Sequence, residues 1–264
     1  MGYKEIYNEW LTNAYFDADT KAELERIASD ENEIKERFYT DLEFGTAGLR
    51  GIIGAGTNRM NIYTVRKATQ GLANYILKSG NAEKGVAIAF DSRRMSPEFA
   101  QEAACCLAAN GIKAYVFDSL RPTPELSYAV RKLGCIAGIN ITASHNPPEY
   151  NGYKVYWEDG AQITPPHDKG IMDEVKAVTD YTTMKTMPAE DAKAAGLYEV
   201  IGAEVDDAYI AELKKQVIHQ DAIDAVGKDL KIVYSPLHGT GNIPARRILN
   251  CLLYTSPSPR DYAA

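Results

Sequence analysis

The sequence predicts an α/β fold with a mixed, largely parallel sheet flanked by helices. Between residues 85 and 141, short apolar runs alternate with amphipathic stretches of helical length. The run 85–90 (GVAIAF) contains no polar residue, which is typical of a strand buried on both faces of a sheet. Because strands and helices alternate along the chain, we expect neighbouring strands to be joined by helical crossovers and to run parallel.

A helical leader is expected over residues 1–40. Its three helices are predicted at 3–11, 21–29 and 31–39. Asp19 and Thr20 supply the start signals for the second of them. A glycine-rich loop over 44–61 follows, and apolar residues at helical spacing then predict a helix over 62–78.

The alternating region supplies the rest of the sheet. We expect strands at 85–90, 113–117 and 135–141, and helices at 96–110 and 124–133. Ser96-Pro97 is typical of a helix start, with serine as the N-cap and proline at the first helical position. Asp91, Asp118 and Ser144 each follow a predicted strand, and open α/β sheets bind their ligands at that edge.

A β-hairpin over 154–164 and a helix over 166–178 are expected to complete the first unit. A helix over 205–216 and a strand over 230–234 are expected to open a second unit of the same kind. We therefore divide the chain into a leader, a first α/β domain (41–190), an irregular linker (191–204), a truncated second α/β domain (205–250) and a tail (251–264). The tail is rich in serine and proline and resembles translated cloning sequence, the alternative being a genuine disordered tail.

Composition excludes several classes of protein. The 264 residues include 45% hydrophobic and 25% charged residues, ordinary values for a globular protein, and the net charge is −7. No cluster of Lys and Arg indicates nucleic-acid binding. No apolar run predicts a signal peptide or a membrane span, so we expect a cytoplasmic protein without a membrane partner. The four cysteines lack metal-ligand spacing and are expected to be reduced; no feature indicates an oligomeric state.

The segment 142–154 (TASHNPPEYNGYK) carries the candidate chemistry. Ser144 is a candidate nucleophile or phosphate carrier, and His145 and Lys154 are candidate proton-transfer or anion-binding groups. The alternative is a surface turn that happens to contain a serine. Adjacent residues of an extended segment point to opposite faces, which argues against a Ser-His hydrolase, and no Gly-x-Ser-x-Gly motif occurs. A phosphoryl relay is therefore favoured over acyl transfer.

This segment resembles the phosphoserine loop of the α-D-phosphohexomutases. Three further blocks agree with that family and occur in its order: FGTAGLRG and GAGTNRMN (44–61), AFDSRRMSPEF (89–99) and YSPLHGTG (234–241). The leader and the Asn58-Arg-Met-Asn61 segment resemble the phosphoglucomutase/phosphopentomutase branch most. The resemblance implies an isomerase that converts glucose 1-phosphate to glucose 6-phosphate, with a pentose phosphate as the alternative substrate.

The resemblance also implies roles for individual residues. Ser144 would carry the phosphoryl group, and glucose 1,6-bisphosphate would be the intermediate and activator. One seryl phosphate oxygen would ligate Mg²⁺. Lys154 and His145 would transfer protons or stabilise charge. The resemblance places Arg50 opposite the phosphoserine and puts Thr46 on the same glycine-rich loop, which favours phosphate binding by both; Arg93 is a further candidate, with a structural ion pair as its alternative.

The sequence departs from the family in two respects. The family has four domains, and we expect this chain to cover only the first and part of the second. No Asp-x-Asp-x-Asp pattern, which would supply the metal carboxylates, occurs in the chain. We therefore expect an N-terminal fragment of a mutase that is inactive by itself. The second hypothesis is a non-catalytic phosphoprotein homologue that keeps the serine loop without the metal site. A small sugar phosphate is the only partner that the motifs predict.

Overall fold

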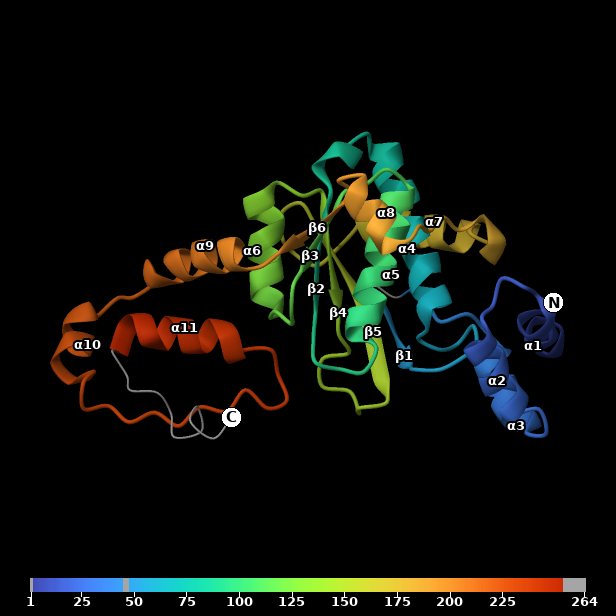
Figure 1. Cartoon of the computed structure of the whole chain (residues 1–264), viewed down its shortest axis with the longest axis horizontal. Coiled ribbons are helices and arrows are strands. Elements are labelled where there is room, and N and C mark those ends of the chain that lie inside the picture. The colour runs from blue at the N-terminus through green and yellow to red at the C-terminus, as the bar shows by residue number, and fades with distance from the viewer. Residues whose placement is uncertain (1, 45–47, 254–264) are drawn as a thin grey trace.

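A six-stranded mixed sheet forms the centre of the molecule (Figure 1), seen here in a computed structural model that describes residues 2–44 and 48–253. The strand order is β1-β5-β4-β2-β3-β6. Their bounds are β1 Leu49–Ile52, β2 Val86–Phe90, β3 Ala114–Phe117, β4 Ala137–Ile141, β5 Tyr150–Trp157 and β6 Tyr198–Ile201. The four strands β4, β2, β3 and β6 run parallel, and β5 pairs antiparallel with both β4 and β1. The predicted fold class is confirmed.

Helices cover both faces of this sheet. The chain passes from β2 to β3 in one direction and from β3 back across β2 to β4 in the other. Right-handed crossovers therefore place α5 and α6 on opposite faces. The first face carries α4 (Ile62–Ser79), α5 (Ser96–Ala109), α7 (His167–Ala177) and α8 (Ala189–Ala194), and the second carries α6 (Thr123–Leu133) and α9 (Ala203–Lys214). Two short 3-10 turns, η1 (Ala82–Lys84) and η2 (Tyr181–Thr183), lie in the connections.

The core has one apolar layer on each face of the sheet. Every residue of β2 is buried, and its side chains alternate between the two layers. Val86, Ile88 and Phe90 belong to the layer under α4 and α5. Ala87 and Ala89 belong to the layer under α6, where small residues let the helix approach the sheet closely.

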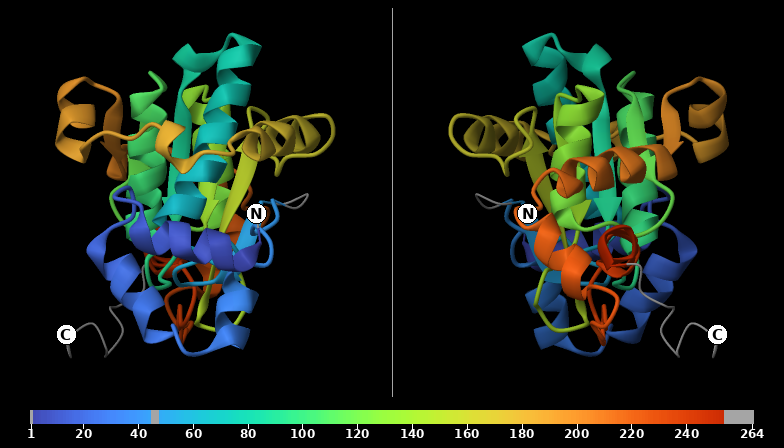
Figure 2. Two further views of the ribbon diagram at one scale, coloured as in Figure 1. Left: turned by 90° about the vertical axis from the view of Figure 1, so that its right-hand side faces the viewer. Right: turned by 90° about the vertical axis from the view of Figure 1, so that its left-hand side faces the viewer.

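The leader folds into three helices, as predicted: α1 (Tyr3–Thr12), α2 (Ala18–Arg26) and α3 (Glu31–Phe38). Helix α2 begins three residues before its predicted start, because Asp17 caps it by accepting from the N–H of Thr20. These helices enclose a separate apolar cluster in which Trp10 is fully buried and stacks on Phe16 with ring centroids 4.2 Å apart. Tyr63 of α4 joins this cluster and donates a hydrogen bond of 2.9 Å to the carboxylate of Asp17. The leader is thereby attached to the first α/β domain. Figure 2 shows the leader at one end of the sheet, away from the C-terminal end of α4.

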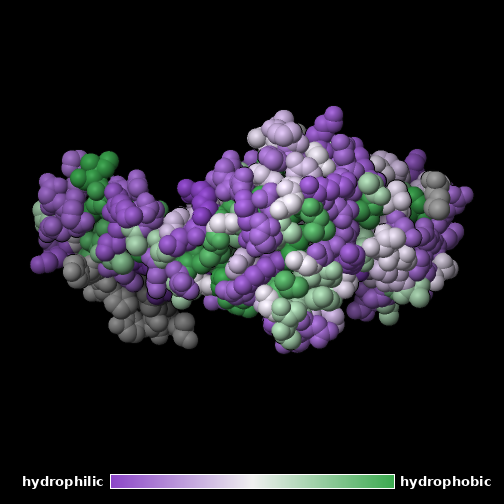
Figure 3. All heavy atoms as spheres, turned by 90° about the horizontal axis from the view of Figure 1, so that it is seen from above, coloured by the Kyte–Doolittle hydropathy of each residue, from purple (hydrophilic) through white to green (hydrophobic). Residues whose placement is uncertain are grey.

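Two predictions for the C-terminal third are wrong. Residues 198–201, predicted to lie in an irregular linker, form β6, which pairs with β3 along its whole length. Residues 230–234, predicted as a strand, form no strand, and the side chain of Val233 is fully exposed. No described segment pairs with this run, and its apolar side chains are exposed. Figure 3 shows apolar side chains at the surface of the smaller lobe, which is formed by residues 218–253.

That lobe contains two more helices. They are α10 (Gln220–Val226), which the sequence did not predict, and α11 (Asn242–Leu253). The last turn of α11 includes the first three residues of the predicted tail, and the rest of that tail lies outside the described residues. Helix α11 is attached to α9 through Arg247, which lies 3.2 Å from a carboxylate oxygen of Asp206.

Candidate functional site

The predicted site residues gather at the carboxyl edge of the parallel strands. The loop after β4, which we call the Ser144 loop (residues 142–149), lies beside the loop after β2 because Asp91 N–H donates to the carbonyl of Ile141 over 3.1 Å. The sequence block 234–241 also reaches this edge. The hydroxyl of Ser92 lies 3.5 Å from the carbonyl oxygen of His238. Three of the four sequence blocks therefore meet at one edge of the sheet.

Ser144 has an unusual backbone. Its φ is +58°, in the left-handed region that few residues other than glycine adopt. Its N–H donates to the hydroxyl of Thr142 over 2.9 Å, which fixes the turn. The side chain is exposed, and its Oγ lies 3.3 Å from Nδ1 of His145. The expectation that the two side chains point apart is wrong, because the backbone between them is not extended.

Lys154 and Arg50 lie on the same face of neighbouring strands. Arg50 is opposite Gly152 in the β1-β5 pair, and Lys154 is two residues further along β5. Partial burial lowers the pKa of Lys154, the positive charge of Arg50 lowers it further, and the carboxylate of Asp91 opposes the change. The neutral amine, which can accept a proton, is therefore more populated than in a free lysine.

Arg93 is engaged by the protein itself. Its Nη1 donates to the carbonyls of Pro147 and Tyr150, and its Nη2 donates to those of Ser144 and Asn146, over distances of 2.6 to 3.0 Å. Its Nε lies 3.5 Å from Asp91. The predicted contact of Arg93 with a phosphate stays a prediction. These bonds favour a role for Arg93 in supporting the Ser144 loop.

The glycine-rich loop approaches β5 closely. Gly48 has φ +111°, and a Cβ at this position would lie 1.9 Å from the carbonyl oxygen of Tyr153. Only glycine allows β1 to begin here. Arg50, two residues on, is exposed at the sheet edge. Thr46, the other predicted phosphate-binding residue of this loop, lies outside the described residues.

Sequence reasoning gave no role to several residues that shape the site. Asn151 donates to the carbonyl of Arg94 over 3.0 Å and to the hydroxyl of Ser96 over 2.9 Å. Ser96 in turn donates to Asp91 over 2.7 Å, so it is not the N-cap of α5; Met95 occupies that position. The Asn-Gly pair at 151–152 was visible in the sequence, but its partners come from a distant loop.

The described residues do not form a magnesium site. No group of three or more His, Cys, Asp or Glu side chains within 2–44 and 48–253 could hold a metal ion. The carboxylate of Asp91 is taken up by Ser96 and by the backbone and side chain of Arg93. Mg²⁺ prefers several oxygen ligands in octahedral geometry, and a seryl phosphate would supply only part of that set.

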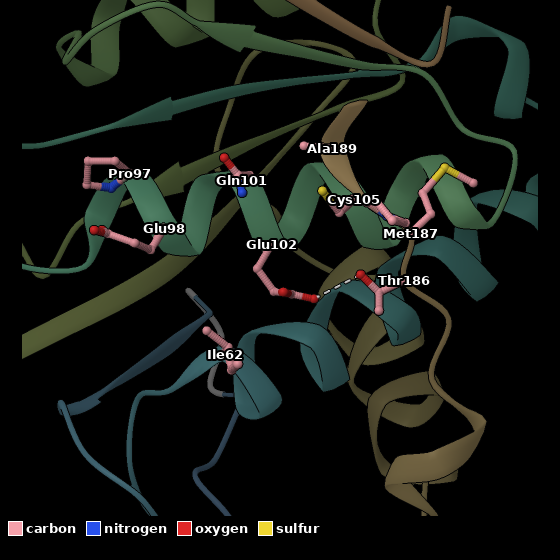
Figure 4. A pocket seen from close by; sticks show the side chains of 10 residues that line it. Ile62, Pro97, Glu98, Gln101, Glu102, Cys105, Thr186, Met187 and Ala189 are labelled. Atoms are coloured by element: carbon pink, nitrogen blue, oxygen red, sulfur yellow. Dashed lines mark hydrogen bonds between the residues drawn. The ribbon is translucent and has the colours of Figure 1, made fainter. Parts of the chain in front are cut away.

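A cavity of about 440 Å³ lies elsewhere, between α5 and the segment 186–189 (Figure 4). Glu102 at its wall accepts hydrogen bonds from Arg66 over 2.6 Å and from Thr186 over 3.2 Å. None of the predicted site residues lines it.

In the described part of the chain, no helix is both long and apolar enough to cross a membrane.

Comparison with known proteins agrees with the fold. A family model described as phosphoglucomutase/phosphomannomutase, alpha/beta/alpha domain I, matches residues 41–182. The chain is 41% identical over 237 residues to a phosphoglucomutase of Staphylococcus epidermidis, covering 89% of this chain and 40% of that protein. It is 37% identical over 233 residues to the human phosphopentomutase, covering 83% of this chain and 37% of that protein.

A solved structure shares the fold. It is the Paramecium phosphoprotein pp63/parafusin, a phosphoglucomutase in its open form, with a TM-score of 0.63, 22% identity, and coverage of 83% of this chain and 42% of that one. The fold and the family match over more than half of the sequence define an α/β/α domain of the phosphosugar mutases. The chain belongs to the phosphoglucomutase/phosphomannomutase family. It spans about 40% of the length of the curated relatives named above.

Proposed function

We propose that Ser144 is the phosphoryl carrier of a mutase that interconverts glucose 1-phosphate and glucose 6-phosphate through a bisphosphate, and that this chain alone transfers the phosphoryl group at Ser144 without completing the interconversion. The presentation of Ser144 carries this proposal. Its hydroxyl is exposed at the carboxyl edge of the sheet, 3.3 Å from His145, on a backbone held in the left-handed region. Arg50 and Lys154 add positive charge to the same edge, which an otherwise acidic protein needs to attract a phosphate.

The loading step uses these groups as follows. Oγ of Ser144 bonds to a phosphorus atom of the sugar bisphosphate, and the bond from that phosphorus to the sugar oxygen breaks. The proton of Oγ passes to Nδ1 of His145 or to the neutral amine of Lys154, and the sugar oxygen takes up a proton and leaves as a hydroxyl group. The return step reverses these changes at the other hydroxyl. Catalysis of this kind depends mainly on positioning and charge neutralisation.

Glucose 1,6-bisphosphate is the proposed activator, and Thr46 is proposed to contact phosphate beside Arg50. We also propose that Mg²⁺ ligates the seryl phosphate. The described residues supply no cluster of carboxylates that would complete the coordination of this ion. A cytoplasmic location and a small sugar phosphate as the sole partner belong to the same proposal.

Phosphopentomutase activity is the second candidate, and the similarity to the human phosphopentomutase favours it. The chain is incubated with glucose 1,6-bisphosphate or with ribose 1,5-bisphosphate, and the phosphorylated peptide is identified by mass spectrometry. Faster labelling of Ser144 by the hexose supports the proposal, and faster labelling by the pentose supports the alternative. If neither bisphosphate labels Ser144, the non-catalytic phosphoprotein hypothesis replaces both.

A further inference from the structure

Two residues with left-handed backbones lie on neighbouring loops. Among the described residues other than glycine, positive φ values occur at Met95 (+64°) and Ser144 (+58°). Met95 belongs to the loop after β2, and Ser144 belongs to the loop after β4. Such conformations persist only when surrounding interactions hold them. We therefore expect contacts between these two loops to hold both conformations.

Arg93 supplies most of those contacts. Its two terminal nitrogens donate to four carbonyl oxygens of a seven-residue stretch, and the shortest bond, 2.6 Å, reaches Asn146. Of the four carbonyls, that of Ser144 itself lies 2.9 Å from Nη2. A bond to this oxygen restricts ψ of Ser144 directly. A planar guanidinium can serve four acceptors in this way, and an ammonium group cannot.

Arg93 is itself held in place from the other side. Its backbone N–H donates to Asp91 over 2.9 Å, and its Nε faces the same carboxylate. Asn151 on β5 ties the loop of Arg93 to the sheet by donating to the carbonyl of Arg94 and to Ser96. Asn151 is fully buried, so this connection is shielded from water. The guanidinium is thus a fixed support for the Ser144 loop.

We propose that Arg93 is a positioning residue for the phosphoryl carrier, which sets the left-handed backbone of Ser144 and thereby the direction of its hydroxyl. The contacts of Arg93 with the Ser144 loop do not depend on the proposed function. Only the reason for positioning Ser144, its role as a phosphoryl carrier, rests on that proposal. Because its terminal N–H groups already have carbonyl partners, Arg93 does not bind the transferred phosphate in this role. Arg50 and Lys154 are left to do that.

The test is made on the full 264-residue chain without substrate. The variants are Arg93→Lys, which keeps the positive charge beside Asp91, and Arg93→Ala. Arg94→Ala is the matched control, since Arg94 is the next residue and its side chain is exposed. The readouts are the Cα and Cβ carbon chemical shifts of Ser144, which report its φ, and hydrogen exchange of the amides of Asn146 and Tyr150.

Both Arg93 variants are expected to move the Ser144 shifts towards extended values and to speed exchange of the loop amides by about tenfold or more, since hydrogen bonds to a charged group are lost. Protection of β2 and β4 amides stays unchanged and shows that the domain is folded. Millimolar guanidinium ion restores the shifts in Arg93→Ala. Wild-type shifts and exchange in Arg93→Lys, or equal effects in Arg94→Ala, would overturn the proposal.

A kinetic readout separates positioning from direct phosphate binding. For labelling of Ser144 by glucose 1,6-bisphosphate, Arg93→Lys is expected to lower the maximal rate and to leave the half-saturating concentration unchanged. The reverse pattern would overturn the proposal in favour of a phosphate contact. If Ser144 is not labelled in the wild type, the proposed function fails, and the carbon shifts still decide the role of Arg93.

Discussion

Arg121 and Asp206 form a two-point ion pair across 85 residues of sequence, with Nε 2.8 Å from Oδ1 and Nη2 3.0 Å from Oδ2. Both side chains are almost fully buried. Arg121 lies in the loop between β3 and α6, and Asp206 lies in the first turn of α9. Through Arg247, the same carboxylate also reaches α11. The pair therefore connects the first α/β domain to the C-terminal lobe.

Loss of Asp206 is expected to be costly. Asp206→Ala leaves a buried guanidinium whose remaining ion pair, among the described residues, is with Asp118, and it should lower the free energy of unfolding by about 3 kcal/mol. Asp207→Ala is the control, because Asp207 also pairs with Arg247 but is 69% exposed, and it should cost less than about 1 kcal/mol. Urea unfolding followed by tryptophan fluorescence measures both. Equal losses would contradict the role given to the buried pair.

Glu125 makes stability depend on pH near neutrality. Its side chain is 1% exposed, and burial, followed by its hydrogen bond with Asp206, raises its pKa from 4.5 to about 8. Tyr209, Arg121 and Arg247 also face it. Between these two pKa values the folded state holds a proton that the unfolded state has released. The free energy of unfolding should therefore fall as pH rises through this window and level off above it.

Glu125→Gln tests this prediction because glutamine keeps the shape and stays neutral. The wild type should lose stability relative to Glu125→Gln as the pH rises from about 5 to 8. Glu98→Gln is a matched control, since Glu98 is also the third residue of a helix with proline at the second position but is exposed. Asp206 does not interfere, because its pKa is lowered and it titrates below this window. A parallel pH profile for Glu125→Gln and wild type would contradict the assignment.

The pKa of Lys154 should respond to its two charged neighbours in opposite directions. Arg50→Gln removes a repelling cation and is expected to raise the pKa, whereas Asp91→Asn removes an attracting carboxylate and is expected to lower it further. Nuclear magnetic resonance titration of the Lys154 side chain measures both changes. A shift of the same sign in both variants would rule out the proposed electrostatics of this edge.

Gly48 should be irreplaceable where β1 meets β5. Gly48→Ala places a Cβ 1.9 Å from the carbonyl of Tyr153 and should destabilise the chain by more than about 1 kcal/mol. Gly80→Ala is the control, because Gly80 also has a positive φ (+73°) but has no atom within 4 Å of the added Cβ. Thermal unfolding compares the two. A Gly80→Ala variant that is no more stable than Gly48→Ala would show that backbone strain, and not the close approach, sets the cost.

The sequence predicted the central elements because their signals are local. The apolar run of β2 and the Pro-containing start of α5 need no knowledge of the rest of the chain. The run 230–234 carries the same apolar signal, yet it forms no strand, since pairing depends on a neighbour that the run itself does not specify. Strand β6 was missed for the opposite reason. It is an edge strand in which Glu199 and Val200 are exposed, so it lacks the buried pattern.

The same limit applies to the site. Ser144, His145 and Lys154 could be proposed from residue type and spacing. The proximity of Ser144 to His145 could not, because it depends on the left-handed φ of Ser144, which no local pattern predicts. Arg93 was singled out as a phosphate-binding candidate, and its carbonyl partners, which are more than 50 residues away in sequence, could not be predicted. The residue types next to a polar side chain do not reveal hydrogen-bond partners that lie far away in the sequence.

The most direct test of the account is whether phosphate on Ser144 can be passed to a sugar phosphate. The chain is produced with phosphoserine incorporated at position 144 and mixed with glucose 1-phosphate, and the fate of the phosphoryl group is followed by phosphorus nuclear magnetic resonance. The account predicts formation of glucose 1,6-bisphosphate and an unmodified Ser144. A phosphoserine that persists, or is released only as inorganic phosphate, would contradict the assignment of Ser144 as a phosphoryl carrier.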